Sequence, residues 1–380
     1  MNIGIPAEIR PGETRVAATP ETVRKLVQTG RHTPIVQTHA GVAASISDAD
    51  FKAAGATIAA REGDIYGQSD IVLKVRAPEA TELPLLRRGS VLVGLLNPHD
   101  DASIDALAGT GVTAFAMEAI PRTTRAQTMD VLSSQANIAG YKAVLLAANE
   151  YARFVPMLMT AAGTVKAAHV LVLGAGVAGL QAIATARRLG AVVEAFDVRS
   201  AVKEQVESLG ARFVEVPVSD AETAAAGSAG GYAREMSDDY KRRQAALIDE
   251  RALGADIIIT TALVPGRPAP VLLRDDTVRR MKPGSVIVDL ATEQGGNCEL
   301  TEQDRVTVSH GVVLIGHSNL PAMVPADASA LYARNLLSFM NLLVDPATGG
   351  LNITRADDIV SASLVCIDGA TVRTREATPA

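Results

Sequence analysis

Short apolar runs alternate with helical patterns in the first third of the chain. Strands are predicted at residues 3–6, 34–38, 71–75, 90–95 and 113–116. A helix is predicted to begin after Thr19, whose side chain can cap it while Pro20 occupies its first turn. Further helical patterns at 48–54 and 103–108 separate the strands. This alternation predicts an open parallel sheet covered by helices.

A second series of apolar runs follows in the middle of the chain, at residues 170–173, 192–197, 211–218, 256–261, 285–290 and 312–315. Long helical patterns, at 130–153 and 327–344, flank this series. We therefore predict an α/β protein with two Rossmann-like open parallel-sheet domains joined by two long helices. The second domain (134–324) is predicted to be inserted into the first, which comprises 1–133 and 325–380. Ligands of such folds bind at strand carboxyl ends and in clefts between domains.

The run at 170–173 leads directly into the turn Gly174-Ala175-Gly176-Val177-Ala178-Gly179. This order of strand, glycine turn, helix and second strand is typical of a dinucleotide-binding unit. Gly174 permits the tight turn, Gly176 lets the backbone approach a pyrophosphate, and Gly179 lets the helix pack close to the strand. The helix N-terminus offers unpaired N–H groups to the phosphates. The alternative is a glycine-rich turn without a ligand.

Asp197 ends the second strand of this unit. A carboxylate at this place can accept hydrogen bonds from both ribose hydroxyls and would repel a 2′-phosphate. The pattern therefore predicts NAD(H) rather than NADP(H) as the bound nucleotide.

The sequence 219–240 is rich in small and polar residues and is long for a connection inside a compact domain. It is predicted to be a mobile lid, in which Gly230 and Gly231 form a hinge and Tyr232 covers the nucleotide. A disordered surface insertion is the alternative.

The composition narrows the functional classes. The 380 residues are 48% hydrophobic and carry a net charge of −6, with dispersed basic residues, so nucleic acid is not an expected partner. The two cysteines, Cys298 and Cys366, form neither a disulfide framework nor a zinc motif, and a cytoplasmic location is expected. The N-terminus predicts a strand rather than a signal peptide. The chain has no run of 18 apolar residues, and no membrane insertion is expected.

A second group of polar residues precedes the first long helix: Arg122, Thr123, Thr124, Arg125, Gln127, Asp130 and Ser133. Arg122 can pair with Asp130, a carboxamide or a phosphate. Gln127 offers a donor and an acceptor to a carboxamide, and Asp130 and Ser133 can bond a nicotinamide amide and ribose. Helix capping by Asp130 within a solvated loop is the alternative.

No other constellation points to catalysis or to a metal. The six histidines are scattered without metal-ligand spacing, and no metal is expected. Lys74, on a predicted strand, is a candidate base or carboxylate anchor. The alternative is a lysine paired with an acid.

Several long stretches, including IGIPAEIRPGETRVAATP, RTTRAQTMDVLSSQANIAGYKAV and VIVDLATEQGGNCE, resemble the soluble NAD(H)-binding component of the proton-translocating NAD(P) transhydrogenases, the alpha subunit or domain I. The resemblance covers nearly the whole chain. It implies an enzyme of the Si-specific, proton-translocating type. NADH would pass its hydride directly to NADP⁺ held by a partner, so no catalytic acid or base is needed.

The resemblance also assigns residues. It implies that Arg122, Gln127, Asp130 and Ser133 serve hydride transfer, with Thr123, Thr124 and Arg125 beside them. It places the pyrophosphate at Gly174, Gly176, Val177 and Gly179, and the adenosine ribose at Asp197, Val198 and Arg199. Gly231 and Tyr232 match the family's mobile loop, Gln244 the following helix, and Leu263 an apolar cofactor contact.

The resemblance further implies a homodimer and two partners, an NADP(H)-binding beta subunit and a membrane-spanning subunit. The assembly would lie on the cytoplasmic face of the inner membrane and couple hydride transfer to proton translocation.

Alanine dehydrogenase shares several of these stretches and is the main alternative. Arg15 and Lys74 match residues with which that family holds its substrate. However, Asn97 stands where that family places its catalytic histidine, although His99 is two residues away. Glu293 matches the histidine's acidic partner. Without an imidazole, amine oxidation lacks a proton acceptor. A third possibility is a non-catalytic NAD sensor or scaffold.

Overall fold

The computed structural model describes residues 1–216, 238–264, 266–345 and 347–372. It divides into two compact units. Unit 1 comprises residues 1–135 with 321–380, and unit 2 comprises residues 136–320. The prediction of two α/β domains, one inserted into the other, is confirmed. The boundaries proposed from the sequence lie within a few residues of these divisions, at 133/134 and 324/325.

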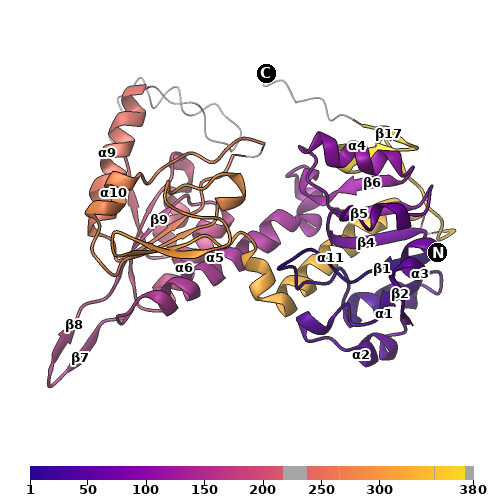
Figure 1. The fold of residues 1–380 in the computed structure, drawn as a ribbon, viewed down its shortest axis with the longest axis horizontal. Coiled ribbons are helices and arrows are strands. Elements are labelled where there is room, and N and C mark those ends of the chain that lie inside the picture. Colours follow the sequence, from indigo (N-terminus) through magenta and orange to yellow (C-terminus); the bar gives the residue numbers. More distant parts are fainter. Residues whose placement is uncertain (217–237, 265, 346, 373–380) are drawn as a thin grey trace. The chain divides into compact units, whose positions relative to one another are not determined.

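Unit 1 is built on an eight-stranded sheet of order β17-β16-β6-β5-β4-β1-β2-β3 (Figure 1). Its strands are β1 (Asn2–Ile5), β2 (Thr33–Gln37), β3 (Thr57–Ala59), β4 (Ile71–Arg76), β5 (Val91–Leu95), β6 (Thr113–Ala116), β16 (Leu364–Ile367) and β17 (Ala370–Thr371). All pairs from β3 to β6 are parallel, whereas β16 and β17 pair antiparallel.

The helices of unit 1 are α1 (Pro20–Gln28), α2 (Asp48–Ala53), α3 (Glu62–Gln68), α4 (Asp101–Gly109), α11 (Pro325–Leu343) and α12 (Asp358–Ser363). Short 3-10 turns lie at η1 (Val42–Ala44), η2 (Leu83–Leu85), η3 (Met117–Ala119), η4 (Thr124–Met129) and η7 (Leu320–Met323). The helix expected after Thr19 begins at Pro20. Thr19 and Thr22 form a reciprocal capping box there, which satisfies two N–H groups of the first turn.

Both faces of the unit 1 sheet are buried, which explains why its strands are continuous apolar runs. Alternate residues of β4 point to opposite faces: Ile71 and Leu73 join one core cluster, and Val72 joins the other. The first cluster also receives α11, whose Phe339 ring meets Phe115 edge-on at 5.5 Å between centroids. Helix α11 therefore belongs to the core of unit 1.

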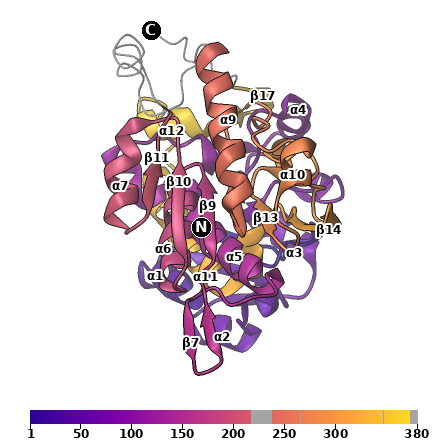
Figure 2. The same ribbon diagram turned by 90° about the vertical axis from the view of Figure 1, so that its left-hand side faces the viewer.

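Unit 2 is built on a seven-stranded sheet of order β11-β10-β9-β12-β13-β15-β14 (Figure 2). Its strands are β9 (His169–Leu173), β10 (Val192–Phe196), β11 (Arg212–Val214), β12 (Ile257–Thr260), β13 (Val286–Asp289), β14 (Val306–Ser309) and β15 (Val312–Ile315). Only β14 is antiparallel among them. The first six strands have the 3-2-1-4-5-6 order of a dinucleotide-binding sheet.

The helices of unit 2 are α6 (Val177–Arg188), α7 (Lys203–Ser208), α9 (Asp238–Gly254) and α10 (Asp275–Arg280), with turns η5 (Ser200–Val202) and η6 (Thr292–Gln294). Helix α5 (Val131–Glu150) begins in unit 1 and continues into unit 2. Gly140 brings α5 against α6, because a Cβ built at Gly140 would lie 2.0 Å from the carbonyl oxygen of Ala178. Any side chain there would push the two helices apart.

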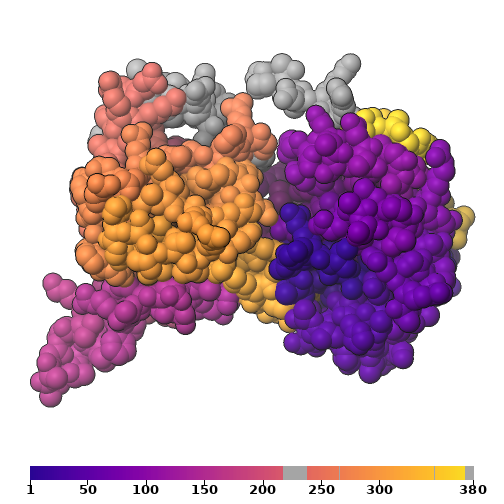
Figure 3. Space-filling view, viewed as in Figure 1, coloured from indigo at the N-terminus to yellow at the C-terminus, as the bar shows by residue number. Residues whose placement is uncertain are grey.

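A hairpin of two short strands, β7 (Leu158–Thr160) and β8 (Gly163–Val165), precedes the sheet of unit 2. It projects away from that sheet in the ribbon and space-filling views (Figure 1, Figure 3). Large apolar side chains gather in and before it and are exposed, with exposed fractions of 57% for Phe154, 62% for Met157 and 70% for Met159. A short isolated hairpin is marginally stable in water, so this surface is a candidate for covering by another chain.

Several expectations are corrected by the structure. The sequence analysis missed β3, α3, the β7–β8 hairpin and the antiparallel strands β14, β16 and β17. Strand β11 is shorter than the run at 211–218 that predicted it. Residues 238–240, assigned to the lid, belong to α9, whereas the rest of that segment, with Gly231 and Tyr232, lies outside the described residues. Within the described ranges, none of the helices is both long and apolar enough to span a membrane.

Candidate functional site

The glycine turn of unit 2 connects β9 to α6 at the carboxyl edge of the sheet. Gly174 has a φ of +102°, in the left-handed region that favours glycine. Its N–H donates to the carbonyl of Phe196 at 2.8 Å, which ties the turn to the end of β10. Gly176 is the N-cap of α6, and no side chain of the described residues caps this helix. The first N–H groups of α6 are therefore suited to an anion such as a pyrophosphate.

Two of the three motif glycines meet tight packing, and the third does not. A Cβ at Gly179 would lie 1.9 Å from the Gly174 carbonyl oxygen, and a Cβ at Gly174 would lie 2.6 Å from Thr261 Oγ1. A Cβ at Gly176 would meet only Arg199 Nη2, at 4.0 Å, among the described atoms. The protein itself thus leaves open the space beside Gly176. This agrees with the expectation that a ligand approaches the backbone at this residue.

Asp197 follows β10 and faces the turn. Its Oδ2 accepts the N–H of Ala175 at 2.7 Å, which orders the turn from the neighbouring strand. Arg199 donates from its backbone to Asp197 Oδ1 at 2.8 Å and from its guanidinium to both carboxylate oxygens at 2.9 Å. The carboxylate predicted to bind the ribose is therefore charge-compensated by its own neighbour. Val198, between them, packs partly buried against one of the two cores of unit 2.

The loop after β12 adds an apolar residue at the same edge of the sheet. Thr261 Oγ1 donates to the Gly174 carbonyl at 3.0 Å, and Leu263 is 43% exposed just beyond it. Buried Asn297 holds this loop, since its side chain bonds both the N–H and the carbonyl of Ala262. Neither Thr261 nor Asn297 could be predicted from local patterns. The contact between Thr261 and the glycine turn follows from the pairing of β12 with β9, which no local pattern reveals. Gln244 is half-buried on α9.

The polar group before α5 forms a pocket in unit 1. The pocket has a volume of about 260 Å³ and is lined by Pro121, Arg122, Thr123, Thr124, Ala126, Gln127, Asp130 and Ser133. Six of these are residues that the sequence analysis assigned to the nicotinamide side. The lining presents a guanidinium, a carboxamide, a carboxylate and hydroxyls, a set that matches the donors and acceptors of an amide and a ribose.

The capping role of Asp130 is present in the structure. Asp130 Oδ1 accepts the N–H of Ser133 at 2.8 Å, and Oδ2 accepts its hydroxyl at 2.5 Å. Arg125 is absent from the pocket lining. Its guanidinium donates to Asp357, the N-cap of α12, at 2.7 and 2.9 Å and also contacts Asp358, the first residue of that helix. Arg125 therefore anchors the segment before α5 to the start of α12.

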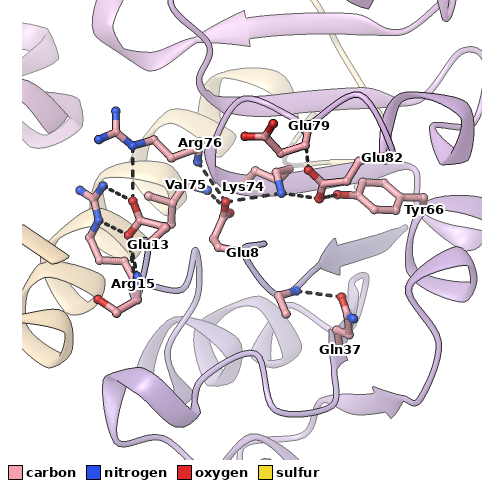
Figure 4. A network of polar contacts seen from close by, with 12 residues as sticks. Glu8, Glu13, Arg15, Gln37, Tyr66, Lys74, Val75, Arg76, Glu79 and Glu82 are labelled. Carbon is pink, nitrogen blue, oxygen red and sulfur yellow. Dashed lines mark hydrogen bonds and ion pairs between the residues drawn. The ribbon is translucent and has the colours of Figure 1, made fainter. Parts of the chain in front are cut away.

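Lys74 and Arg15 belong to a buried network of ion pairs in unit 1 (Figure 4). Lys74 Nζ lies 2.7 Å from Glu82 Oε1 and 3.4 Å from Glu8 Oε2, and all three side chains are at most 2% exposed. Burial raises the pKa of Glu8, and the positive charge of Lys74 opposes that rise. Arg15 donates to both carboxylate oxygens of Glu13, at 2.7 and 2.6 Å. Both cations are paired and shielded from solvent, which favours a structural role.

Asn97 and His99, which bear on the alanine dehydrogenase alternative, are exposed after β5, and Glu293 is exposed in η6 of unit 2. Asn97 has a φ of +53°, and its N–H donates to Glu118 Oε1 at 2.6 Å. The other carboxylate oxygen, Glu118 Oε2, is buried with no hydrogen-bond partner among the described residues. Within the same residues, no three His, Cys, Asp or Glu side chains form a metal-binding group.

The state of Glu118 predicts a pH dependence of stability. Burial raises the pKa of Glu118 from 4.5 to about 7. A raised carboxyl pKa means that the native state holds the proton more tightly than the unfolded state. The unfolding free energy should therefore fall as pH rises from about 4.5 to 7, by the order of 3 kcal/mol. We expect E118Q to remove this component, so that its stability relative to the wild type increases between pH 5 and pH 8 in urea unfolding. An equal difference at both pH values would contradict the assignment.

Two models of known protein families match this chain. The family model for the alanine dehydrogenase/PNT N-terminal domain matches residues 4–139, and that for the alanine dehydrogenase/PNT C-terminal domain matches residues 143–374. The chain is 52% identical over 378 residues to an NAD(P) transhydrogenase alpha-subunit polypeptide of Rhodospirillum rubrum, with 98% of each chain covered.

Two further relatives are a transhydrogenase and an alanine dehydrogenase. A solved structure of a transhydrogenase from Sinorhizobium meliloti is similar with a TM-score of 0.85 at 45% identity, covering 98% of this chain and 99% of that chain. The alanine dehydrogenase of Mycobacterium tuberculosis is 31% identical over 386 residues, covering 100% of this chain and 96% of that protein.

Proposed function

Because the chain belongs to the alanine dehydrogenase/PNT family, we propose that it is the NAD(H)-binding alpha subunit of an NAD(P) transhydrogenase. In this role it takes hydride from NADH and passes it directly to NADP⁺ bound by a partner polypeptide. The observation that carries the proposal is the polar pocket of unit 1, whose lining includes Arg122, Gln127, Asp130 and Ser133. Within unit 2, the open backbone at Gly176 and the carboxylate of Asp197 separately support binding of a pyrophosphate and a ribose.

The residues fit the nucleotide, which would supply the hydride at its nicotinamide ring. Gln127 can pair with the carboxamide through one donor and one acceptor, so that it fixes the rotation of the ring. Asp130 and Ser133 hold each other and would present oxygen atoms to the ribose. Direct transfer between two rings moves no proton at the reacting carbons. The protein therefore contributes orientation and exclusion of water rather than acid–base chemistry.

Amino-acid oxidation by the isolated chain is the second candidate function. It is supported by the 31% identity to an alanine dehydrogenase. Such a reaction requires a group that accepts the amine proton. Asn97 cannot serve, and Lys74 is held by Glu8 and Glu82 in the core. We therefore favour transhydrogenation.

The proposed function can be tested by mixing the purified chain with an NADP(H)-binding transhydrogenase domain. Reduction of an acetylpyridine or thio analogue of the acceptor nucleotide by NADH is then followed by absorbance. We expect reduction that requires both polypeptides, and no NAD⁺ reduction with alanine and the chain alone. Alanine-dependent NAD⁺ reduction would favour the dehydrogenase. NADH binding without hydride transfer would favour a sensor or scaffold.

We further propose that the chain is a homodimer in which the β7–β8 hairpin contacts the second copy. The exposed side chains of Met157 and Met159 support this role, because large apolar patches on a surface usually mark interfaces. The assembly would dock on NADP(H)-binding and membrane-spanning subunits at the cytoplasmic face of the inner membrane, where hydride transfer would be coupled to proton translocation.

Introducing negative charges into the β7–β8 hairpin should dissociate the proposed dimer into monomers. The double variant M157E/M159E is expected to sediment as a monomer at concentrations at which the wild type is a dimer, because burying two carboxylates without partners is costly. V42E, at a position 57% exposed in unit 1, serves as the matched control and should remain dimeric. A dimeric double variant would show that the hairpin does not form the interface.

A further inference from the structure

A buried asparagine lies behind the pocket of unit 1. Asn335 is on α11 and is 8% exposed. Its Nδ2 donates to the carbonyl oxygen of Thr128 at 2.8 Å, and its Oδ1 accepts the hydroxyl of Ser134 at 2.8 Å. The side chain thus uses a donor and an acceptor at the same time. A carboxamide or a protonated carboxyl group of this length can do so, whereas an ionised carboxylate can only accept.

The two partners of Asn335 adjoin two residues of the pocket. Thr128 follows Gln127 in η4, and Ser134 follows Ser133 in the first turn of α5. Asn335 therefore fixes the backbone that carries Gln127 and the helix that carries Ser133. A single side chain from a third element sets the spacing between the two walls of the pocket.

Further buried hydrogen bonds in unit 1 hold the start of α5 in place. Gln135, 7% exposed, donates to the carbonyl of Ala328 on α11 at 3.1 Å. Arg15 Nη1 in turn donates to Gln135 Oε1 at 2.8 Å. Arg15 is held by Glu13, as Figure 4 shows. The first turn of α5 is thus fastened to α11 and to the buried ion pairs. Satisfied buried polar networks of this kind rigidify a structure.

We propose that Asn335 is a positioning residue for hydride transfer, which holds Gln127 and Ser133 at the spacing that the nicotinamide side requires. The inference rests on the proposed function. Asn335 does not line the pocket, and it acts through Thr128 and Ser134. Its loss should therefore lower the rate of hydride transfer while changing NADH affinity little, since misplacement of about 1 Å can cost a rate factor on the order of 100.

The decisive variant is N335D, because its effect must depend on pH. An ionised carboxylate has no hydrogen for Thr128 and would repel the carbonyl oxygen, whereas a protonated carboxyl group donates to Thr128 and still accepts from Ser134. We expect N335D to transfer hydride within about threefold of the wild-type rate near pH 5.5, and at least tenfold more slowly near pH 8. The wild-type rate of hydride transfer should change little between pH 5.5 and pH 8. An equal loss of rate at both pH values would indicate that packing at this position, and not the hydrogen bond to Thr128, is responsible.

A second measurement does not rely on hydride transfer. Backbone hydrogen exchange of the peptide 124–134, compared with the wild type at the same pH, should be at least tenfold faster in N335D near pH 8 and close to wild type near pH 5.5. Accelerated exchange in N335D, combined with no hydride transfer by the wild type, would support the role of Asn335 in holding η4 and α5 and would overturn the proposed function. If N335D near pH 8 shows wild-type exchange and a wild-type rate of hydride transfer, the positioning role of Asn335 is wrong, and the proposed function is unaffected.

Y332F is the matched control. Tyr332 is also buried on α11, and its hydroxyl donates to the carbonyl of Lys74 on β4 at 2.8 Å. The substitution removes one buried hydrogen bond without touching the pocket. It should lower stability yet leave the hydride transfer rate and the exchange of 124–134 unchanged. A fall in rate equal to that of N335D near pH 8 would show that general destabilisation, not positioning, is responsible.

Discussion

The variant Q127N is expected to slow hydride transfer about a hundredfold while NADH affinity stays within about threefold of the wild type. Asparagine keeps the carboxamide but shortens the side chain by one methylene, so the amide can no longer hold the ring at the same place. In the proposed site, the pyrophosphate and the adenosine ribose are bound by other residues, which the substitution leaves unchanged. The effect should therefore fall on the rate and not on the affinity.

The measurement is a single-turnover rate with the NADP⁺-loaded partner domain, together with calorimetric titration by NADH. Q28N, an equal shortening at an exposed position of α1, is the control and should match the wild type in both. An unchanged single-turnover rate in Q127N would remove Gln127 from the proposed positioning role. A large loss of affinity would mean that Gln127 contributes binding rather than orientation.

The variant D197N is expected to reverse the nucleotide preference. The wild-type carboxylate is bonded to Ala175 N–H and to the Arg199 guanidinium. Asparagine can still accept from Ala175 but lacks the charge with which, in our proposal, Asp197 bonds the ribose hydroxyls and repels a 2′-phosphate. NADH affinity should fall by about 10- to 100-fold, since a hydrogen bond to a charged group contributes roughly 1.5–3 kcal/mol. NADPH affinity should rise, because Arg199 is released to pair with the phosphate.

The double variant D197N/R199A tests the part assigned to Arg199. It should bind NADH as weakly as D197N does and should lose the gain in NADPH affinity. Calorimetric or fluorescence titration of both nucleotides with the three proteins measures the change. If D197N gains no affinity for NADPH, the arginine is not the phosphate ligand, and the selectivity of the site has another origin.

Local patterns allowed much of the fold to be predicted. The glycine turn, the strand before it and Asp197 lie within one short βαβ unit, and each requirement of that unit falls on a fixed residue type. Thr19 could likewise be predicted as a cap, because capping depends on the next few residues only. Except for β3, the parallel strands of both sheets could be predicted, because burial on two faces makes them continuously apolar.

The features that were missed depend on contacts between distant segments. Strand β16 pairs with β6 through Leu364 and Phe115, and no local pattern reveals such an antiparallel addition. Asn335 bonds Thr128 across 207 positions, and its own neighbours on α11 give no sign of that role. A lone asparagine in a helix pattern carries no functional signal by itself.

Lys74 shows a different limit of sequence reasoning. Its position on a strand allowed either a substrate anchor or a lysine paired with an acid. The choice depends on Glu8 and Glu82, which come from other segments and complete the ion pairs in the core. Charge pairing on a buried central strand is a tertiary property, so the sequence alone left the two alternatives open.

The origin of the transferred hydrogen tests the central claim most directly. The chain is mixed with NADH carrying deuterium at the transferable position of its nicotinamide ring and with an NADP⁺-loaded partner domain in ordinary water, and the product is analysed by mass spectrometry. Transfer between the two rings predicts NADPH that retains the deuterium in full. NADPH that has lost deuterium to solvent, or no NADPH although both nucleotides bind, would contradict the account.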